Sequence, residues 1–260
     1  MQPVILSERL RAVASMVTQG SRVCDVGCDH GFVSIYLIEQ KISPHVVAMD
    51  VREGPLGAAG KHVAERALEP YIETRLSDGL HNYRNGEADS LVCAGMGGRL
   101  MMRILGEDRV KTDSFRELIL QPQSELEQFR GWLWAQGYSI TDEKMVQEDG
   151  KFYPMMRVVP GDAPADGGAF AGNPVIPEPL WKIFCRYGQL LLLRKDCTLK
   201  AYLKHEEKIY GGILEQLKRQ DLSSGRRKKR YVEVEILLKE CLMAQEIMKR
   251  KRGSYGYDQN

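Results

Sequence analysis

Five short apolar runs, separated by segments of helical periodicity, organise the first 159 residues of the chain. Alternation of this kind predicts βαβ units, and hence a parallel sheet, because parallel strands need a crossover connection. The expected strands are Arg22–Val26, His45–Asp50, Ile72–Ser77, Ser90–Ala94 and Leu118–Gln121. The expected helices are Leu6–Thr18, Val33–Gln40, Pro55–Ala67, Arg99–Leu105 and Glu125–Gln136.

The pattern changes after the fifth strand. Ser139–Val146 and Phe152–Val159 look extended, and the turn between them contains Asp149-Gly150, a hairpin signal. A mostly parallel sheet closed at one edge by an antiparallel hairpin differs from the all-parallel sheet of dinucleotide-binding dehydrogenases. It is typical of methyltransferases, so we expect an α/β fold of the Rossmann-like class I methyltransferase type.

The last third of the chain has a different composition. Residues 161–180 are rich in Pro, Gly, Ala and Asp, which indicates a linker between residues 1–160 and residues 181–260. Two heptad stripes follow, and the Ser and Gly residues between them predict an antiparallel helical coiled-coil hairpin. The stripes are Leu199, Leu203, Glu206, Tyr210, Ile213 and Leu217, then Val234, Leu237, Cys241, Ala244 and Met248. Heptads pair within a chain or between chains, so a monomer and a weak homodimer both remain open.

Charge is unevenly distributed along the chain. Residues 1–159 carry 18 Lys and Arg against 22 Asp and Glu, whereas residues 160–260 carry 19 against 13. Two basic runs lie near opposite ends of the second expected tail helix: Arg226, Arg227, Lys228, Lys229 and Arg230, and then Lys249, Arg250, Lys251 and Arg252. Such runs are often only solvated surface, but they also suit contacts with RNA phosphates.

The sequence shows no secretory signal pattern and no apolar stretch long enough to span a membrane. Its six cysteines are scattered, and no pair has CxxC spacing. We therefore expect a cytoplasmic protein with free thiols, no metal and no membrane partner.

The strongest local motif follows the first strand. Asp25 and Gly27 begin an acidic-x-Gly-x-x-x-Gly loop that ends at Gly31. Glycines in this position let a ligand approach the backbone closely, and the spacing differs from the Gly-x-Gly-x-x-Gly pattern of dinucleotide binding. A plain strand-to-helix turn is the simpler alternative.

Acidic residues also follow the next two strands. Asp50 can accept hydrogen bonds from both hydroxyls of a ribose. Asp78, which precedes Gly79, can accept a hydrogen bond from the amino group of adenine. Helix capping is the alternative for each. After the fourth strand, Ala94-Gly95-Met96-Gly97-Gly98 would leave the backbone open beside a bound methyl donor. The Asp/Asn-Pro-Pro-aromatic segment of enzymes that methylate the exocyclic nitrogen of adenine is missing there, which makes that acceptor unlikely.

Several segments together resemble the bacterial tRNA (adenine-22-N1)-methyltransferase family. They are DVGCDHG at 25–31, SDG at 77–79, AGMGG at 94–98, LILQPQ at 118–123 and EDGKFY at 148–153, followed by the coiled-coil tail. The resemblance covers nearly the full length. It implies an S-adenosylmethionine-binding domain, a tail that helps to grip tRNA, and methylation of N1 of a tRNA adenosine.

The expected site follows from these motifs. Asp29 and His30 are the candidate catalytic residues, with positioning of the base or of the methionine moiety favoured over formal acid–base catalysis. Hydrogen bonding of His30 to the loop backbone is the simpler alternative. The residues expected to bind the cofactor are Asp25, Gly27, Cys28, Asp29, His30, Asp50, Val51, Ser77, Asp78, Gly79, Ala94, Gly95 and Met96.

Two other functions remain open at this stage. A methyltransferase that acts on a small molecule or protein would share the cofactor loops but would not need the basic tail. A non-catalytic RNA-binding module would need the tail and tolerate loss of the cofactor site.

Overall fold

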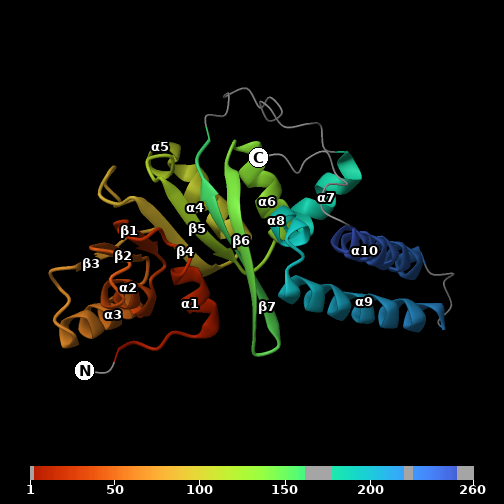
Figure 1. Cartoon of the computed structure of the whole chain (residues 1–260), viewed down its shortest axis with the longest axis horizontal. Helices are drawn as coiled ribbons and strands as arrows, with labels where there is room; N and C mark the ends of the chain where they lie inside the picture. Colours follow the sequence, from red (N-terminus) through yellow and green to blue (C-terminus); the bar gives the residue numbers. More distant parts are fainter. Residues whose placement is uncertain (1–2, 162–176, 220–224, 251–260) are drawn as a thin grey trace. The chain divides into compact units, whose positions relative to one another are not determined.

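The computed structural model describes residues 3–161, 177–219 and 225–250. Contacts within the chain divide it into two compact units, Met1–Ala171 and Gly172–Asn260. Figure 1 shows the sheet of the first unit and the helices of the second, and each unit is described here by itself. No helix in the described part of the chain has the length and apolar character needed to cross a membrane.

The first unit is built on one seven-stranded sheet. The strands are β1 (Val23–Val26), β2 (Val46–Asp50), β3 (Ile72–Leu76), β4 (Ser90–Met96), β5 (Glu117–Pro122), β6 (Ser139–Glu148) and β7 (Lys151–Val159). Their order is β3-β2-β1-β4-β5-β7-β6. Strands β1 to β5 are parallel, and β7 pairs antiparallel with both β5 and β6. The predicted mostly parallel sheet with an antiparallel edge is confirmed.

Helices cover both faces of this sheet (Figure 1). They are α1 (Glu8–Ala14), α2 (Phe32–Glu39), α3 (Glu53–Glu65), α4 (Gly98–Glu107), α5 (Arg109–Thr112) and α6 (Leu126–Ala135). Side chains alternate between two separate cores, as the two-residue period of a strand requires. Val46 and Ala48 pack with residues of α1, α2 and α3, whereas Val47 and Met49 pack with residues of α4 and α6. Strands β1, β2 and β5 are buried on both faces, whereas β3 and β6 at the two edges of the sheet are partly exposed.

Two helices differ from the prediction. Helix α1 is shorter than the expected Leu6–Thr18, because the chain leaves the helix after Ala14 and Thr18 binds the buried Glu117 through its backbone N–H and its hydroxyl, each at 2.8 Å. The Glu117 carboxylate on β5 therefore holds the non-helical segment that follows α1. The short helix α5 was not foreseen, since four residues are too few to show a period.

The β6–β7 hairpin turns within two residues. Asp149 and Gly150 both have positive φ, at 49° and 73°. Two successive left-handed residues match the twist of the strands they join, which is why Asp-Gly favours such turns. The predicted turn is confirmed, and it is tighter than the sequence suggested, since pairing extends to Glu148 and Lys151.

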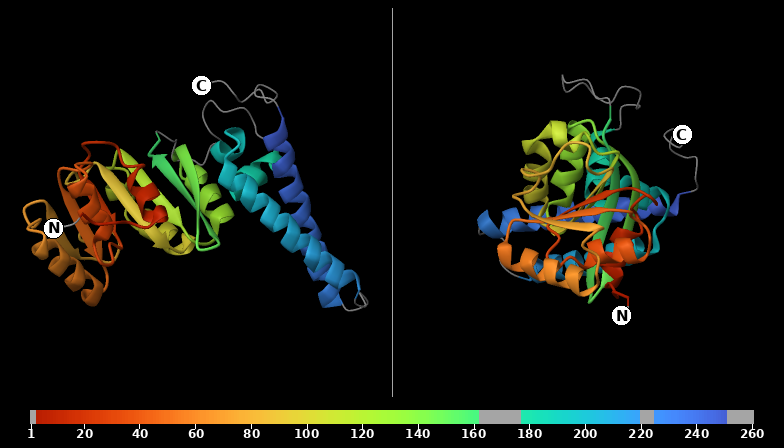
Figure 2. Two further views of the ribbon diagram at one scale, coloured as in Figure 1. Left: turned by 60° about the horizontal axis from the view of Figure 1, so that its bottom comes forward. Right: turned by 90° about the vertical axis from the view of Figure 1, so that its left-hand side faces the viewer.

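The second unit contains four helices among its described residues. They are α7 (Glu178–Tyr187), α8 (Gln189–Leu193), α9 (Cys197–Lys218) and α10 (Gly225–Lys249). Helices α9 and α10 pack side by side, as both views in Figure 2 show, which agrees with the expected helical hairpin. Helix α7 begins inside the 161–180 segment, so the last three residues of the expected linker are helical. The rest of that linker, apart from residues 161 and 177, and residues 221–224 between the long helices lie outside the described residues.

The core of the second unit includes a buried polar cluster. Glu206, one of the predicted heptad positions, accepts hydrogen bonds from the hydroxyls of Tyr187, Tyr202 and Tyr210 at 2.7 to 2.8 Å. The guanidinium of Arg186 lies 3.9 Å from the same carboxylate. Buried charge is tolerated here because hydrogen bonds satisfy the carboxylate on several sides.

Candidate active site

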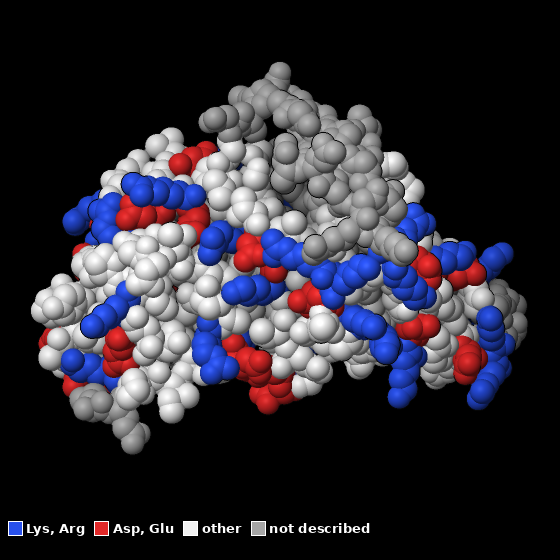
Figure 3. Space-filling model, viewed as in Figure 1, with Lys and Arg blue, Asp and Glu red and all other residues white. Residues whose placement is uncertain are grey.

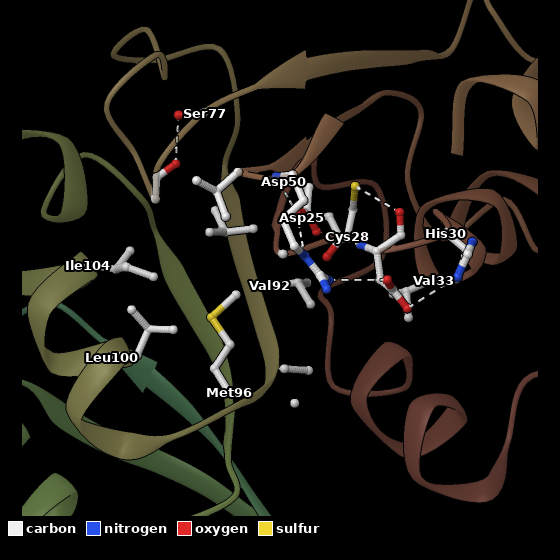
Figure 4. Close-up of a pocket in the computed structure, with 18 of the residues that line it drawn as sticks. Asp25, Cys28, His30, Val33, Asp50, Ser77, Val92, Met96, Leu100 and Ile104 are labelled. Atoms are coloured by element: carbon white, nitrogen blue, oxygen red, sulfur yellow. Dashed lines mark hydrogen bonds and ion pairs between the residues drawn. The ribbon is translucent and has the colours of Figure 1, made fainter. Parts of the chain in front are cut away.

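A cavity of about 710 Å³ opens at the carboxyl ends of strands β1 to β5. Open α/β sheets bind ligands at this edge, where the strand order reverses between β1 and β4. Figure 4 shows the labelled side chains around the cavity, which come from the strands, from the loops after β1 and β3, and from α2 and α4. Each of the thirteen residues expected to bind the cofactor lines it. The structure therefore brings these predicted residues together.

The loop after β1 is shaped by its backbone. Gly27 has a φ of 75°, and a side-chain Cβ there would collide with the methyl group of Met96. Asp29 is also left-handed, with a φ of 52°, which Asp tolerates better than most residues. The Met96 side chain therefore lies against the face of Gly27, and a ligand reaches this backbone where that flexible side chain moves aside.

Asp25 is buried beneath this loop. Its carboxylate accepts a hydrogen bond of 2.7 Å from the hydroxyl of Ser34 on α2. Burial raises the pKa of Asp25 to about 6, the Ser34 hydrogen bond opposes the rise, and the charge of Asp50 adds to it. Asp25 therefore ties β1 to α2, and it titrates near neutrality instead of being a permanently ionised carboxylate.

Asp50 ends β2 with only 4% of its surface exposed. One carboxylate oxygen accepts the backbone N–H of Asp29 at 3.1 Å, and the other accepts that of Arg52 at 2.9 Å. An ionised carboxylate has about four acceptor positions, so two remain for a ligand. The backbone bonds hold the carboxylate in one orientation at the wall of the cavity.

Asp78 follows β3 in a more exposed position. It forms a two-pronged ion pair with Arg103 of α4, with N–O distances of 2.8 and 3.2 Å. The Arg103 hydrogen bonds hold the pKa of Asp78 below its usual value. The neighbouring turn is set by Ser77, whose hydroxyl donates to the carbonyl of Gly79 at 2.9 Å.

Asp29 and His30 lie at the rim of the cavity with exposed side chains. The Asp29 carboxylate is 3.4 Å from the guanidinium of Arg52 and 3.9 Å from His30 Nε2. The ring of Phe32 stacks on that of His62 with centroids 4.9 Å apart, and the His30 ring lies 6.0 Å from Phe32. Among the described residues the carboxylate within ion-pair distance of His30 is that of the exposed Asp29, so the geometry suits contact with a ligand better than proton transfer.

Several residues of the cavity were missed by sequence reasoning. Arg9 and Leu10 come from α1, and Gln123 follows β5. Leu100, Arg103 and Ile104 form a wall on α4. The helical spacing of Leu100, Arg103 and Ile104 could have shown that they share one face of α4. No local pattern shows that α1 reaches this edge of the sheet.

The donor set of the cavity fits S-adenosylmethionine. Fixed carboxylate oxygens suit its ribose hydroxyls and its ammonium group, and the left-handed glycine backbone leaves room for a close approach. Burial raises the pKa of the Cys28 thiol well above its usual range, so this thiol stays protonated. The described residues hold no group of three His, Cys, Asp or Glu arranged to bind a metal.

The sheet order, the antiparallel β6–β7 edge and the acidic residues at successive strand ends define a class I methyltransferase with an S-adenosylmethionine site. Residues 6–156 match the family model described as a methyltransferase domain. The tRNA (adenine(22)-N(1))-methyltransferase of Bacillus subtilis is 31% identical over 82% of this chain and 87% of its own. The chain belongs to this family of tRNA methyltransferases.

Solved structures agree over nearly the whole chain. The crystal structure of the B. subtilis tRNA methyltransferase superposes with a TM-score of 0.76 at 26% identity, covering 95% of this chain and 100% of the other. A Streptococcus pneumoniae protein in complex with S-adenosyl-L-methionine gives a TM-score of 0.75 at 28% identity, covering 94% and 100%. The similarity therefore includes both units.

Proposed function

We propose that the protein transfers the methyl group of S-adenosylmethionine to N1 of adenosine 22 in tRNA, in the cytoplasm, as a monomer or weak homodimer. The proposal rests on the cavity, where the carboxylates and glycines expected to bind the cofactor lie together at one edge of the sheet. The chain also belongs to the family of the B. subtilis enzyme. The atom and position are those in the name of the B. subtilis relative.

The cofactor, when bound, supplies an electrophilic methyl group on a sulfonium. Asp50 accepts hydrogen bonds from the two ribose hydroxyls through its remaining acceptor positions. Asp78 would accept a hydrogen bond from the adenine amino group while Arg103 holds its carboxylate in place. Gly95 would let the ligand lie against the backbone of β4, and Gly27 would do the same after β1 once the Met96 methyl group moves from its face.

Methyl transfer to N1 needs alignment more than proton transfer. A neutral adenine N1 has a lone pair and no proton to remove, so a strong base is not required. Near-attack alignment supplies roughly 7 to 11 kcal/mol in favourable cases. Because N1 lies on the Watson–Crick edge, the base must be turned out of its stack, which costs a few kcal/mol. Asp29 and His30, at the rim, position the base or the methionine moiety.

The second unit offers cations for the RNA backbone. Arg226, Arg227, Lys228, Lys229 and Arg230 are exposed in the first turns of α10. Figure 3 shows Lys and Arg along the helical unit, interspersed with Asp and Glu. Of the other predicted basic run, Lys249 and Arg250 are exposed, whereas Lys251 and Arg252 lie outside the described residues. We assign Arg226 to Arg230 to tRNA phosphates, which give affinity without sequence choice.

The first experiment uses the purified full chain, tritiated S-adenosylmethionine and tRNA transcripts with adenosine at position 22, followed by nucleoside analysis. Labelled 1-methyladenosine is the expected product. A transcript with guanosine at position 22 should stay unlabelled, and so should a reaction with the Asp50→Ala variant. Label in another nucleoside would overturn the N1 assignment. No label in RNA, with label in a small molecule or a protein, would favour the alternative methyltransferase.

A charge variant tests the RNA assignment separately. Replacing all five residues from Arg226 to Arg230 by Gln should raise the KM for tRNA, leave S-adenosylmethionine binding unchanged, and flatten the dependence of tRNA affinity on salt. The matched control replaces five other cations by Gln, and all of them are exposed on α9 or just before it: Lys195, Lys200, Lys204, Lys208 and Lys218. Equal effects of the two sets would mean that total charge matters and not this segment of α10.

A further inference from the structure

Arg9 of α1 is held in the cavity from three sides. Its Nη1 donates a hydrogen bond of 2.9 Å to the Oε1 of Gln121 on β5. Its guanidinium carbon lies 5.4 Å from the ring centroid of Tyr153 on β7. Its Nη1 is also 3.8 Å from where a Cβ on Gly95 would stand. The guanidinium is therefore positioned by residues of β4, β5 and β7.

The charge around Arg9 differs from that around the other arginines of the cavity. Arg52 lies within ion-pair distance of Asp29 and Asp50, and Arg103 pairs with Asp78. The side chain of Arg9 donates its hydrogen bond to a neutral amide, and it forms no ion pair with any carboxylate in the described part of the chain. The backbone N–H of Arg9 donates a hydrogen bond of 3.1 Å to the carboxylate of Glu148, and this bond, together with the charge of Arg9, lowers the pKa of Glu148. Because no ion pair within the described residues holds the guanidinium, its remaining side-chain N–H groups can bind an anionic group of a ligand.

The order of the strands gives the direction in which such a ligand lies. Asp78, Asp50, Gly27 and Gly95 come from the ends of β3, β2, β1 and β4, which are neighbours in that order. Neighbouring strands are about 4.8 Å apart, so Gly95 lies about 10 Å from Asp50 along the edge. With ribose at Asp50 and adenine toward β3, the remaining part of the ligand extends over Gly27 toward Gly95, where Arg9 lies.

We propose that Arg9 binds the α-carboxylate of the methionine moiety of S-adenosylmethionine. The proposal rests on the proposed function, because it assumes that this cavity holds the methyl donor. The carboxylate is the only anionic group of that ligand, and it stands at the end of the methionine chain. A guanidinium binds a carboxylate with parallel hydrogen bonds, and prior fixation by Gln121 and Tyr153 reduces the entropy lost on binding. Arg9 is thus a positioning residue that sets where the sulfonium lies.

The test compares two ligands that differ only in this carboxylate. Calorimetry measures the Kd of S-adenosylmethionine and of decarboxylated S-adenosylmethionine for the full-length wild type, Arg9→Gln, Arg9→Lys and Arg11→Gln. Arg11 is the matched control, because it is exposed on the same helix and does not line the cavity.

Arg9→Gln should weaken binding of S-adenosylmethionine about 10- to 100-fold and leave the decarboxylated ligand nearly unchanged. Arg9→Lys should fall between, since it keeps the charge and loses the planar fork. Arg11→Gln should match the wild type with both ligands. Thermal unfolding without ligand checks that α1 is intact in each variant.

Two results would overturn the proposal. Equal weakening of both ligands by Arg9→Gln would mean that Arg9 only supports the wall of the cavity. Unchanged binding of S-adenosylmethionine with a raised KM for tRNA would assign Arg9 to an RNA phosphate. If the wild type itself bound neither ligand, the proposed function would fail instead, so the two failures are distinguishable.

Discussion

Asp25 provides the most quantitative test of the site, because its carboxyl group is buried and its ionisation is linked to folding. We consider the Asp25→Asn variant, which keeps the shape and can still accept the hydrogen bond from Ser34. Burial raises the pKa of Asp25 from 3.8 to about 6 in the fold. At a pH between these two pKa values, the carboxyl group of Asp25 therefore carries a proton more often in the folded protein than in the unfolded chain.

The sign and size of the effect follow from this shift. A raised folded-state pKa contributes stability that is fully present below the unfolded pKa and is lost as pH rises through the folded pKa. With the two pKa values of 3.8 and about 6, the contribution is about 2 kcal/mol at pH 4.5 and close to zero at pH 7.5. The wild type should therefore lose about 2 kcal/mol relative to Asp25→Asn over this range.

Urea unfolding at pH 4.5, 5.5, 6.5 and 7.5 measures this difference. A Trp181→Phe background in both proteins leaves Trp132 and Trp134 as the fluorescent reporters, both on α6 of the first unit. The difference in unfolding free energy between the two proteins should change steadily with pH. Parallel curves, or divergence in the opposite direction, would show that Asp25 keeps an ordinary pKa and would refute the reasoning.

Two further predictions concern stability. Gly31→Ala should lower the unfolding free energy by about 2 to 4 kcal/mol, because the new Cβ would be 3.0 Å from that of Ala59 in addition to the strain of a left-handed residue. Gly86→Ala has a similar φ and open space, so denaturant titration should show only about 1 to 2 kcal/mol. Glu206→Gln should lower the thermal midpoint seen by circular dichroism, since an amide cannot accept all three tyrosine hydroxyls. The loss should be about 2 to 4 kcal/mol, and an unchanged midpoint would show that the cluster adds nothing.

Much of the first unit could be predicted because its signals are local. Four of the five parallel strands are mainly apolar runs, and β3 alternates uncharged and charged residues. Asp50 ends β2, and Asp78 follows β3. Once the strands are parallel, their carboxyl ends must share one edge. The grouping of the motifs around one cavity therefore follows from chain order and strand direction.

Other features depend on contacts between distant parts of the chain. Arg9 lies more than a hundred residues from Gln121, and no periodicity shows that they meet. The contact of Thr18 with Glu117, 99 residues away, is equally hidden from local patterns. In the second unit the heptad pattern located the long helices, but it treated Glu206 as one of a stripe and gave no sign of its tyrosine partners on two helices.

The cavity is assembled from segments that run from Arg9 to Gln123 in the chain. Strand β4 lies between β1 and β5 in the sheet. The edge that carries the cavity is therefore continuous only after β4, which is synthesised later, has paired with β1, which is synthesised earlier. A nascent chain that has not yet emerged to Gln123 lacks one wall of the cavity. A ligand that binds only the finished edge stabilises that state by mass action and gives partly folded chains no such help. The methyl donor would thus stabilise a new molecule only after synthesis has passed Gln123 and the sheet is complete.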